Sequence, residues 1–266
     1  MAKFTDKVIV VTGASEGIGR ALCLALAPQK PRLVLAARNE GRLHELKTEV
    51  EGMGARALVV PTDVTSEEAC GRLIRTTIEK WACLDVLVNN AGASMWSRVE
   101  DITDTSIFEK IMRLNYLGSV YCTYYALPDL KKTGGLIVAV SSVAGLTGVP
   151  TQSGYAASKH ALFGFFDSLR IELERTGVDV TIIAPDFVLS EIYRRSLGRD
   201  GKPMGKSPRG DKIMTAEKCA TLIVRAMENR ERMLLTSTRA RLGRWVRMFS
   251  PRFIDYVAKK AIRREK

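Results

Sequence analysis

Short runs of Val, Ile and Leu recur along the chain and are separated by helix-length stretches of mixed polarity. Nearly continuous apolar runs of this kind are typical of parallel strands that are covered on both faces. The predicted strands are Lys7–Thr12, Arg32–Ala37, Arg56–Pro61, Leu84–Val88, Leu136–Ser141, Val178–Ala184 and Met233–Thr236. The predicted helices are Gly17–Ala27, Glu40–Glu51, Ser66–Trp81, Asp104–Leu130, Ser153–Thr176 and Ala216–Asn229.

This alternation of strands and helices predicts a fold of the α/β class. Right-handed βαβ units lead to a single doubly wound, Rossmann-type domain with a seven-stranded, mainly parallel sheet and helices on both faces. Because no repeat or linker interrupts the pattern, we expect this domain to span residues 1–238, followed by a basic helical C-terminal extension over 239–266. The glycine-containing stretch Leu197–Asp211 fits either a surface loop or a lid over a substrate cleft.

Composition narrows the function classes. The chain is 46% hydrophobic and 26% charged, which is ordinary for a globular protein and argues against disorder. No apolar run approaches the ~18–20 residues that cross a bilayer, and the strand-like stretch near the start leaves no room for a signal peptide. Five scattered cysteines and two isolated histidines favour neither disulfides nor a metal site. We therefore expect a cytoplasmic protein without a metal.

The net charge of +12 is concentrated near the C-terminus. Residues 230–266 hold 12 Lys and Arg against 3 Asp and Glu, which leaves 29 against 26 for the remainder. Ser250 and Pro251 signal a helix start within this segment, where apolar and basic residues fall on different faces. Two interpretations stay open: the segment rests peripherally on an anionic membrane surface or another anionic, apolar partner, or its apolar face packs on its own subunit or cleft. No nucleic-acid-binding module is recognisable, so nucleic acid is not expected as a partner.

A glycine-rich turn at the end of the first predicted strand indicates a nucleotide site. The strand runs into Thr12-Gly-Ala-Ser-Glu-Gly-Ile-Gly19, and a helix follows. Glycines permit the tight turn and let backbone N–H groups approach a pyrophosphate at the helix N-terminus. The expected cofactor contacts in this turn are Gly13, Ser15, Glu16, Gly17, Ile18 and Gly19.

The end of the second predicted strand bears on the choice of cofactor. A carboxylate there would bind the adenosine ribose 2′-hydroxyl of NAD, whereas an arginine accommodates a 2′-phosphate. Ala37 leaves the acidic position empty and Arg38 supplies a planar cation suited to phosphate. We therefore expect NADP(H) to be favoured over NAD(H), although Glu16 weakens the attraction for the extra phosphate.

Tyr155 and Lys159 are four residues apart at the start of a predicted helix, so they share one face. An ammonium beside a phenol favours the phenolate and is expected to lower the pKa of Tyr155 toward the working pH. Ser142 ends the fifth predicted strand and thereby lies at the carboxyl edge of the sheet, where ligands bind in this architecture. The three residues predict acid/base chemistry on a substrate oxygen.

Five motifs occur together and in order: Thr12-Gly-x3-Gly-x-Gly19, Asn89-Asn-Ala-Gly92, Asn115, Ser142 and Tyr155-x3-Lys159. In this combination the chain resembles the short-chain dehydrogenase/reductase family in its compact form, roughly over residues 5–236. The resemblance implies a catalytic set of Ser142, Tyr155, Lys159 and Asn115. Tyr155 would exchange the proton, Ser142 would steady the substrate oxygen, Lys159 would hold the nicotinamide ribose, and Asn115 would keep a water in a proton relay.

The same resemblance implies further cofactor contacts, which are Asp63 and Val64 at the adenine, Asn90, Ala91 and Gly92 along the floor, and Pro185, Val188 and Ser190 near the nicotinamide. The chain departs from the family where Pro185-Asp186 replaces the common Pro-Gly, which puts the local turn in question.

The implied activity is an NADP(H)-dependent carbonyl reductase or alcohol dehydrogenase. Apolar residues near strand ends and in the possible lid favour a hydrophobic carbonyl or alcohol substrate: Met95, Trp96, Val143, Leu146, Phe187, Ile192 and Tyr193. The alternative is a nucleotide-sensing regulatory or binding protein with little turnover. Phe163, Phe165, Phe166 and Leu169 cover more of one helix than a single sheet contact needs, so we also expect a homodimer or homotetramer.

Overall fold

The computed structural model describes residues 3–189, 195–205 and 214–263. Its main sheet has seven strands in the order β3-β2-β1-β4-β5-β6-β9, and every neighbouring pair is parallel. The strands are β1 (Val8–Thr12), β2 (Arg32–Ala37), β3 (Arg56–Pro61), β4 (Val86–Asn89), β5 (Leu136–Val140), β6 (Asp179–Ala184) and β9 (Met233–Leu235). The predicted doubly wound α/β fold is therefore confirmed, with strand ends within two residues of those expected.

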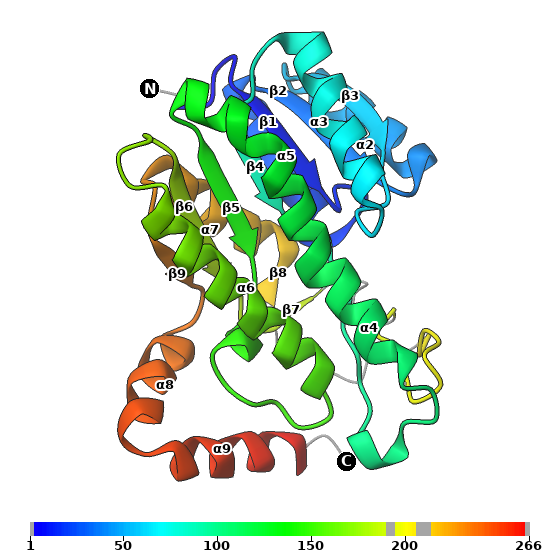
Figure 1. The fold of residues 1–266 in the computed structure, drawn as a ribbon, viewed down its shortest axis with the longest axis vertical. Coiled ribbons are helices and arrows are strands. Elements are labelled where there is room, and N and C mark those ends of the chain that lie inside the picture. Colours follow the sequence, from blue (N-terminus) through cyan, green and yellow to red (C-terminus); the bar gives the residue numbers. More distant parts are fainter. Residues whose placement is uncertain (1–2, 190–194, 206–213, 264–266) are drawn as a thin grey trace.

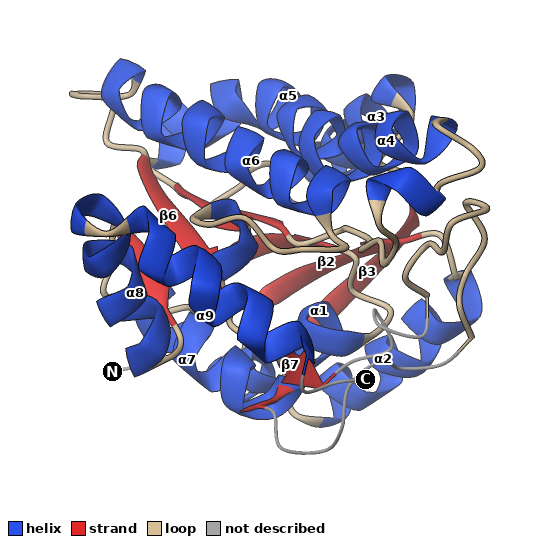
Figure 2. Ribbon diagram, turned by 90° about the horizontal axis from the view of Figure 1, so that it is seen from below, coloured by secondary structure: helices blue, strands red, loops and turns tan. Residues whose placement is uncertain are grey.

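Helices cover both faces of the sheet (Figure 2). One layer contains α1 (Gly17–Leu26), α2 (Glu40–Gly52) and α7 (Ala216–Glu228). The other contains α3 (Glu67–Trp81), α4 (Ser106–Met112), α5 (Gly118–Thr133) and α6 (Ser153–Glu172). Successive residues of β1 alternate between the two layers, Ile9 and Val11 joining one core and Val8 and Val10 the other. This double coverage explains why the strands are apolar throughout.

The predicted helix Asp104–Leu130 is interrupted in the structure. It consists of α4, a π-helical turn over Arg113–Leu117 and α5. A π-helical turn inserts one extra residue per turn and is frequent at functional sites. Hydrophobic periodicity cannot reveal such a turn, because the apolar pattern resumes after it. Elsewhere in the described chain, single 3₁₀ turns occur at Ala27–Gln29, Val99–Asp101 and Val143–Gly145.

Beyond the main sheet, β7 (Val188–Leu189) and β8 (Met214–Thr215) form a small parallel pair that the sequence did not predict. Leu197 bridges to Met95 and to Pro203. The described part of the predicted loop Leu197–Asp211 therefore lies beside the carboxyl edge of the main sheet. Residues 206–211 fall outside the described chain, so the choice between surface loop and lid stays open.

Two helices follow β9: α8 (Thr238–Phe249) and α9 (Pro251–Arg263). Figure 1 shows them on the side of the molecule toward which the strands of the main sheet point. Ser250 and Pro251 mark the junction between them, as the sequence predicted. Within the described residues, no helix combines the length and the apolar character that a membrane span requires.

Candidate active site

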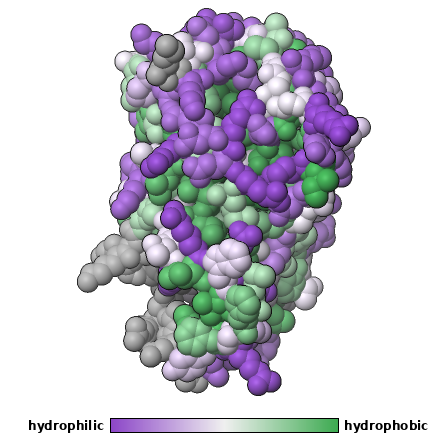
Figure 3. Space-filling model, turned by 90° about the vertical axis from the view of Figure 1, so that its left-hand side faces the viewer, coloured by the Kyte–Doolittle hydropathy of each residue, from purple (hydrophilic) through white to green (hydrophobic). Residues whose placement is uncertain are grey.

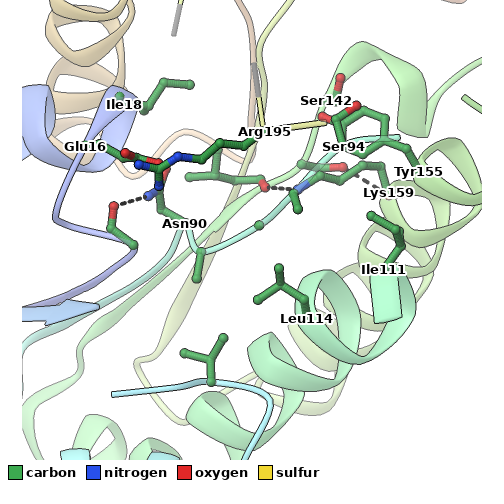
Figure 4. Close-up of a pocket in the computed structure, with 18 of the residues that line it drawn as sticks. Glu16, Ile18, Asn90, Ser94, Ile111, Leu114, Ser142, Tyr155, Lys159 and Arg195 are labelled. Carbon is green, nitrogen blue, oxygen red and sulfur yellow. Dashed lines mark hydrogen bonds and ion pairs between the residues drawn. The ribbon is translucent and has the colours of Figure 1, made fainter. Parts of the chain in front are cut away.

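A cavity of about 1040 Å³ opens at the carboxyl edge of the sheet. At one end lie Glu16 and Ile18, and at the other Ser142, Tyr155 and Lys159 (Figure 4). Sixteen of the predicted site residues line it: Gly13, Ser15, Glu16, Gly17, Ile18, Arg38, Asp63, Val64, Asn90, Ala91, Gly92, Ser142, Tyr155, Lys159, Pro185 and Val188. Gly19 and Asn115 lie behind its wall, and Ser190 falls outside the described residues.

The glycine turn has the conformation that a nucleotide-binding turn needs. Gly13 and Gly17 have φ angles of +66° and +55°, which favour glycine. A Cβ on Gly19 would lie 2.3 Å from the carbonyl oxygen of Gly13 and 2.5 Å from the Asn90 side chain. Asn90 Nδ2 donates to the carbonyl oxygens of Thr12 and Gly13 at 2.9 and 3.2 Å. The turn is thus held flat against the end of β4, with the N-terminus of α1 facing the cavity.

Glu16, the residue before α1, is held by two arginines. Its carboxylate accepts from Arg42 Nη1 at 2.7 Å and from Arg195 Nη1 at 2.6 Å, so Arg195 reaches the glycine turn from the far side of the cavity (Figure 4). Arg38 is exposed on the cavity wall and makes no hydrogen bond or ion pair with a described residue. The negative charge that counted against phosphate binding is therefore offset locally. Sequence reasoning missed Arg42 and Arg195, which are 26 and 179 positions from Glu16.

At the adenine side, the chain turns sharply after β3. Asp63 Oδ1 accepts from the backbone N–H and the hydroxyl of Thr65, at 3.0 and 2.8 Å. Val64 is buried and packs against Gly118, where a Cβ would come within 2.8 Å of a Val64 methyl group. The carboxylate of Asp63 thus shapes its own loop as well as lining the cavity.

The catalytic candidates converge from β5 and α6. Tyr155 and Lys159 lie one helical turn apart near the start of α6, with Lys159 Nζ 5.7 Å from the centre of the Tyr155 ring. Nζ donates to the carbonyl oxygen of Val140 at 2.9 Å, and Ser142 Oγ accepts from the N–H of Ala144 at 3.1 Å. The Ser142 side chain lies beside the Tyr155 phenol and lowers its pKa. Two hydroxyls therefore face one point in the cavity, with a buried ammonium behind them.

The electrostatics of this pair differ from the prediction in one respect. Burial raises the pKa of Tyr155, and the Ser142 side chain beside it lowers the value only in part. Lys159 does not lower the tyrosine pKa here, because its ammonium is turned toward Val140 rather than the phenol oxygen. Burial also lowers the pKa of Lys159 to about 8. The expected approach of the Tyr155 pKa toward neutrality is therefore wrong for the protein without cofactor.

Asn115 lies in the π-helical turn and is completely buried. Its side chain accepts from the N–H of Ala93 at 2.8 Å and donates to the carbonyl oxygen of Ala93 and to Ser158 Oγ, both at 2.9 Å. These bonds connect the floor of the cavity to α6. A Cβ on Gly92 would approach Asn115 Oδ1 to 3.0 Å and Lys159 Nζ to 3.6 Å, so the three residues are closely packed.

Apolar side chains form part of the lining in the substrate half of the cavity. Among the residues that were expected there, Val143 and Phe187 line the wall, while Met95 is fully buried in a small cluster that also contacts Tyr155. Leu146 packs into the main core, Trp96 is half-buried, and Ile192 and Tyr193 lie outside the described residues. Sequence reasoning missed Gln152, which lines the cavity and is only 4% exposed.

The structure bears on two further expectations, which concern subunit assembly and metal ions. Phe163, Phe166 and Leu169 of α6 are buried in the core of their own subunit, so the reasoning that required a partner to cover them was wrong. Phe165 is half-buried and meets Tyr116 edge-on. In the part of the chain that the structure describes, no three His, Cys, Asp or Glu residues gather in a way that could hold a metal ion.

Comparison with known proteins agrees with this geometry. Residues 7–199 match the family described as short chain dehydrogenase. The chain is 38% identical over 226 residues to an 11-beta-hydroxysteroid dehydrogenase from Pinus massoniana, covering 82% of this chain but only 63% of that protein. A short-chain dehydrogenase/reductase from Burkholderia phymatum, solved with NAD, is 25% identical with a TM-score of 0.84 over 95% of this chain and 96% of that one.

A second solved structure is similar over most of its length. It is an alcohol dehydrogenase from Thermococcus sibiricus in complex with 5-hydroxy-NADP, 26% identical with a TM-score of 0.76, covering 86% of this chain and 95% of that one. One neighbour thus holds NAD and the other an NADP derivative, so the comparisons leave the choice of cofactor open.

Proposed function

The chain belongs to the short-chain dehydrogenase family, and on this premise we propose that it interconverts a carbonyl and a secondary alcohol on a hydrophobic substrate with NADP(H). The observation that carries the proposal is the meeting of the Ser142 and Tyr155 hydroxyls at one end of the cavity, with Lys159 buried behind them. A packed apolar cluster would stabilise the fold better than these three polar groups do, which favours a catalytic role for them.

The residues present fit a dinucleotide. The glycine turn, the N-terminus of α1 and the cavity volume provide a cradle in which a Cβ at Gly19 would collide with backbone. The nicotinamide of a bound NADP(H) supplies or accepts the hydride. Gly13 and Ile18 would bind its phosphates, Asn90 would lie along the floor of the cofactor site, and Asp63 would contact its adenine.

In the direction of reduction, Tyr155 Oη transfers its proton to the substrate oxygen while Ser142 donates a hydrogen bond to the same oxygen. The raised pKa keeps Tyr155 in the protonated form that this step requires. Ser142, which lowers the pKa of Tyr155, stabilises the phenolate left behind. The Lys159 ammonium behind the two hydroxyls remains mostly charged at pH 7, since its pKa is about 8. Asn115 fixes the floor of the site against α6, and its place in a proton relay remains part of the proposal.

The preference for NADP(H) is supported by the charges around Glu16. Arg38 and Arg195 line the cavity, and Arg42 and Arg195 both pair with Glu16, so three guanidiniums are set against the carboxylates of Glu16 and Asp63. This excess of positive charge suits a phosphate monoester, which carries about −1.5 to −2 charges at pH 7. These arginines would therefore attract an adenosine 2′-phosphate, whereas Ala37 offers no carboxylate to accept a hydrogen bond from a 2′-hydroxyl.

The test of this preference is the ratio of kcat/KM for NADPH and NADH. Arg38→Ala should lower kcat/KM for NADPH by about tenfold or more and leave NADH unaffected, since a charge-assisted hydrogen bond contributes about 1.5–3 kcal/mol. Arg72→Ala is the matched control, because Arg72 is also exposed but lies on α3 and pairs with Glu68. Equal kcat/KM values for the two cofactors in the unmodified enzyme would refute the preference.

For the substrate, the apolar lining at Val143, Phe187 and Leu197 supports a hydrophobic body. The Pinus massoniana relative is named as acting on a steroid, which places steroid-like ketones first in a panel with retinoid, fatty and aromatic ketones. We expect NADPH oxidation with at least one of these. Tight NADPH binding without turnover of any ketone, or of the matching alcohols with NADP, would instead indicate a nucleotide sensor.

The free cysteines fit a protein of the cytoplasm. Cys23, Cys70, Cys122 and Cys219 are buried, Cys83 is half-buried, and the structure pairs none of the five in a disulfide. Thiols persist in a reducing compartment, which supports the cytoplasmic location that we propose.

A further inference from the structure

Helices α8 and α9 carry large apolar side chains that their own subunit leaves uncovered. Phe249 is 83% exposed and Trp245 61%. Leu242, Met248, Phe253 and Tyr256 are exposed as well, and together these six residues form what we call the C-terminal apolar face. Apolar atoms gather at the lower part of the surface in Figure 3, where α8 lies. Exposed patches of this kind mark interaction sites far more often than isolated exposed residues do.

Its own subunit covers the described apolar side chains of this segment only in part. No residue of α8 is buried, and only Ala240, Gly243 and Val246 are half-buried on its inner side. On α9, Ile254 and Ala258 are the half-buried residues between 251 and 259. The side chains that point inward are thus small or few, and the aromatic ones remain outside.

The helices are nevertheless fixed to the active-site side of the molecule. Asp186, at the position where the family commonly has Gly, accepts from Ser237 Oγ at 2.7 Å and from Arg239 Nη2 at 2.8 Å. The Arg239 guanidinium also lies over the Phe187 ring, 5.6 Å from its centre. Because Phe187 lines the cavity, the start of α8 is joined directly to the loop that borders the proposed nicotinamide and substrate positions.

Basic side chains accompany the apolar face. Arg241, Arg244, Arg247, Arg252 and Lys259 are exposed, and between residues 238 and 259 Asp255 is the sole acidic residue. A two-fold contact between copies through this face would place these cations against their own counterparts, which is unfavourable. An anionic lipid surface satisfies both features, since each Lys or Arg near it adds about 1 kcal/mol and Trp, Tyr and Phe favour the interface.

We propose that the C-terminal apolar face and its arginines dock the protein onto an anionic lipid bilayer, with the cavity side of the molecule toward the membrane (Figure 1). Helices of this composition lie in the interface plane, with apolar side chains among the acyl chains and cations at the headgroups. Docking itself is independent of the proposed function. Only its purpose, the supply of a hydrophobic substrate from the lipid phase, rests on that function.

Vesicle flotation tests the proposal with the full chain. Vesicles of phosphatidylcholine with and without about 30% phosphatidylserine are compared at low and high salt, where charge attraction to anionic lipid is screened. The first variant, Trp245→Ser/Phe249→Ser, removes apolar contacts. The second, Arg244→Glu/Arg247→Glu, reverses two charges. Matched controls are Met53→Ser/Val99→Ser and Lys80→Glu/Lys131→Glu, which alter exposed residues on other helices and turns. NADPH binding by each variant verifies its fold.

We expect the unmodified protein to float with the anionic vesicles and to be released by salt. Each C-terminal variant should lose at least about tenfold in partitioning while the controls keep it. Equal partitioning into both vesicle types would overturn the proposal. A second result would also overturn it. If the protein does not float, and light scattering shows that Trp245→Ser/Phe249→Ser lowers its molar mass, a second copy of the chain covers the face instead. Because flotation needs no turnover, its failure is distinct from failure of the proposed function.

Discussion

Lys159 offers a direct test of the electrostatics in the cavity. Its side chain is 4% exposed, and burial lowers its pKa from an ordinary 10.5 to about 8. Replacement by Met keeps the length and apolar stem of the side chain and removes the charge. We therefore expect Lys159→Met to stabilise the cofactor-free protein at neutral pH while it impairs activity, a trade-off typical of functional sites.

The magnitude follows from the two pKa values. The pKa of Lys159 in the folded protein is about 2.5 below its value in the unfolded chain. Below pH 8, where folded and unfolded protein both carry the proton, this difference lowers the free energy of unfolding by about 3 kcal/mol. The unfolded state binds more protons than the folded state between pH 8 and 10.5, so stability rises with pH through this window. By pH 10 the cost falls below about 1 kcal/mol. Losing the hydrogen bond to Val140 costs Met about 1 kcal/mol at either pH.

The assay is urea unfolding of both proteins at pH 7 and pH 10, without cofactor. Lys159→Met should be more stable than the parent by about 2 kcal/mol at pH 7, and this advantage should disappear at pH 10. Lys80→Met is the control, because Lys80 is exposed and its replacement should show no such dependence. A stability difference for Lys159→Met that is unchanged between the two pH values would refute the reasoning.

Three further predictions follow from packing and exposure. Gly19→Ala should raise the Kd of NADPH at least about tenfold in a fluorescence titration, since its Cβ would meet the Gly13 carbonyl. Gly164→Ala is the control, because the space around Gly164 is open and the Kd should not change. Equal Kd values for the two variants would contradict the packing. Asn115→Ala should lower the free energy of unfolding by about 3 kcal/mol, because it leaves the backbone of half-buried Ala93 and the hydroxyl of buried Ser158 without their partner. A loss below about 1 kcal/mol would be inconsistent with that network. Light scattering at micromolar concentration should give the mass of a homodimer or homotetramer. Ile171→Asp should weaken this assembly, since Ile171 on α6 and Tyr124 on α5 are each 70% exposed. A monomeric mass for the parent protein would rule the assembly out.

Much of the fold could be predicted from local sequence. Strands buried on both faces are apolar throughout, so β1, β2 and β5 were recognisable without any tertiary information. The glycine turn was recognisable for a similar reason, because its conformation needs residues without a Cβ at Gly13 and Gly17. Features dictated by local backbone geometry leave local sequence signals.

Features that depend on contacts distant in sequence could not be predicted. Arg195 meets Glu16 across 179 residues, and nothing in the residues around either one signals the pair. The π-helical turn at Asn115 interrupts a helix whose apolar pattern continues past it. The pKa of Tyr155 was predicted from its neighbour Lys159, whereas the larger effect is desolvation, which depends on everything packed around the phenol.

The central claim is that the Tyr155 hydroxyl transfers the proton. Single-turnover NADPH oxidation with the best ketone should be about 10²–10⁴-fold slower in Tyr155→Phe, the range that positioned acid/base groups contribute, while the Kd of NADPH stays within about twofold. Tyr116→Phe, which removes a hydroxyl from a half-buried ring outside the cavity, should leave both quantities unchanged. A Tyr155→Phe enzyme that retains more than about a hundredth of the parent rate would contradict the role of Tyr155 as general acid.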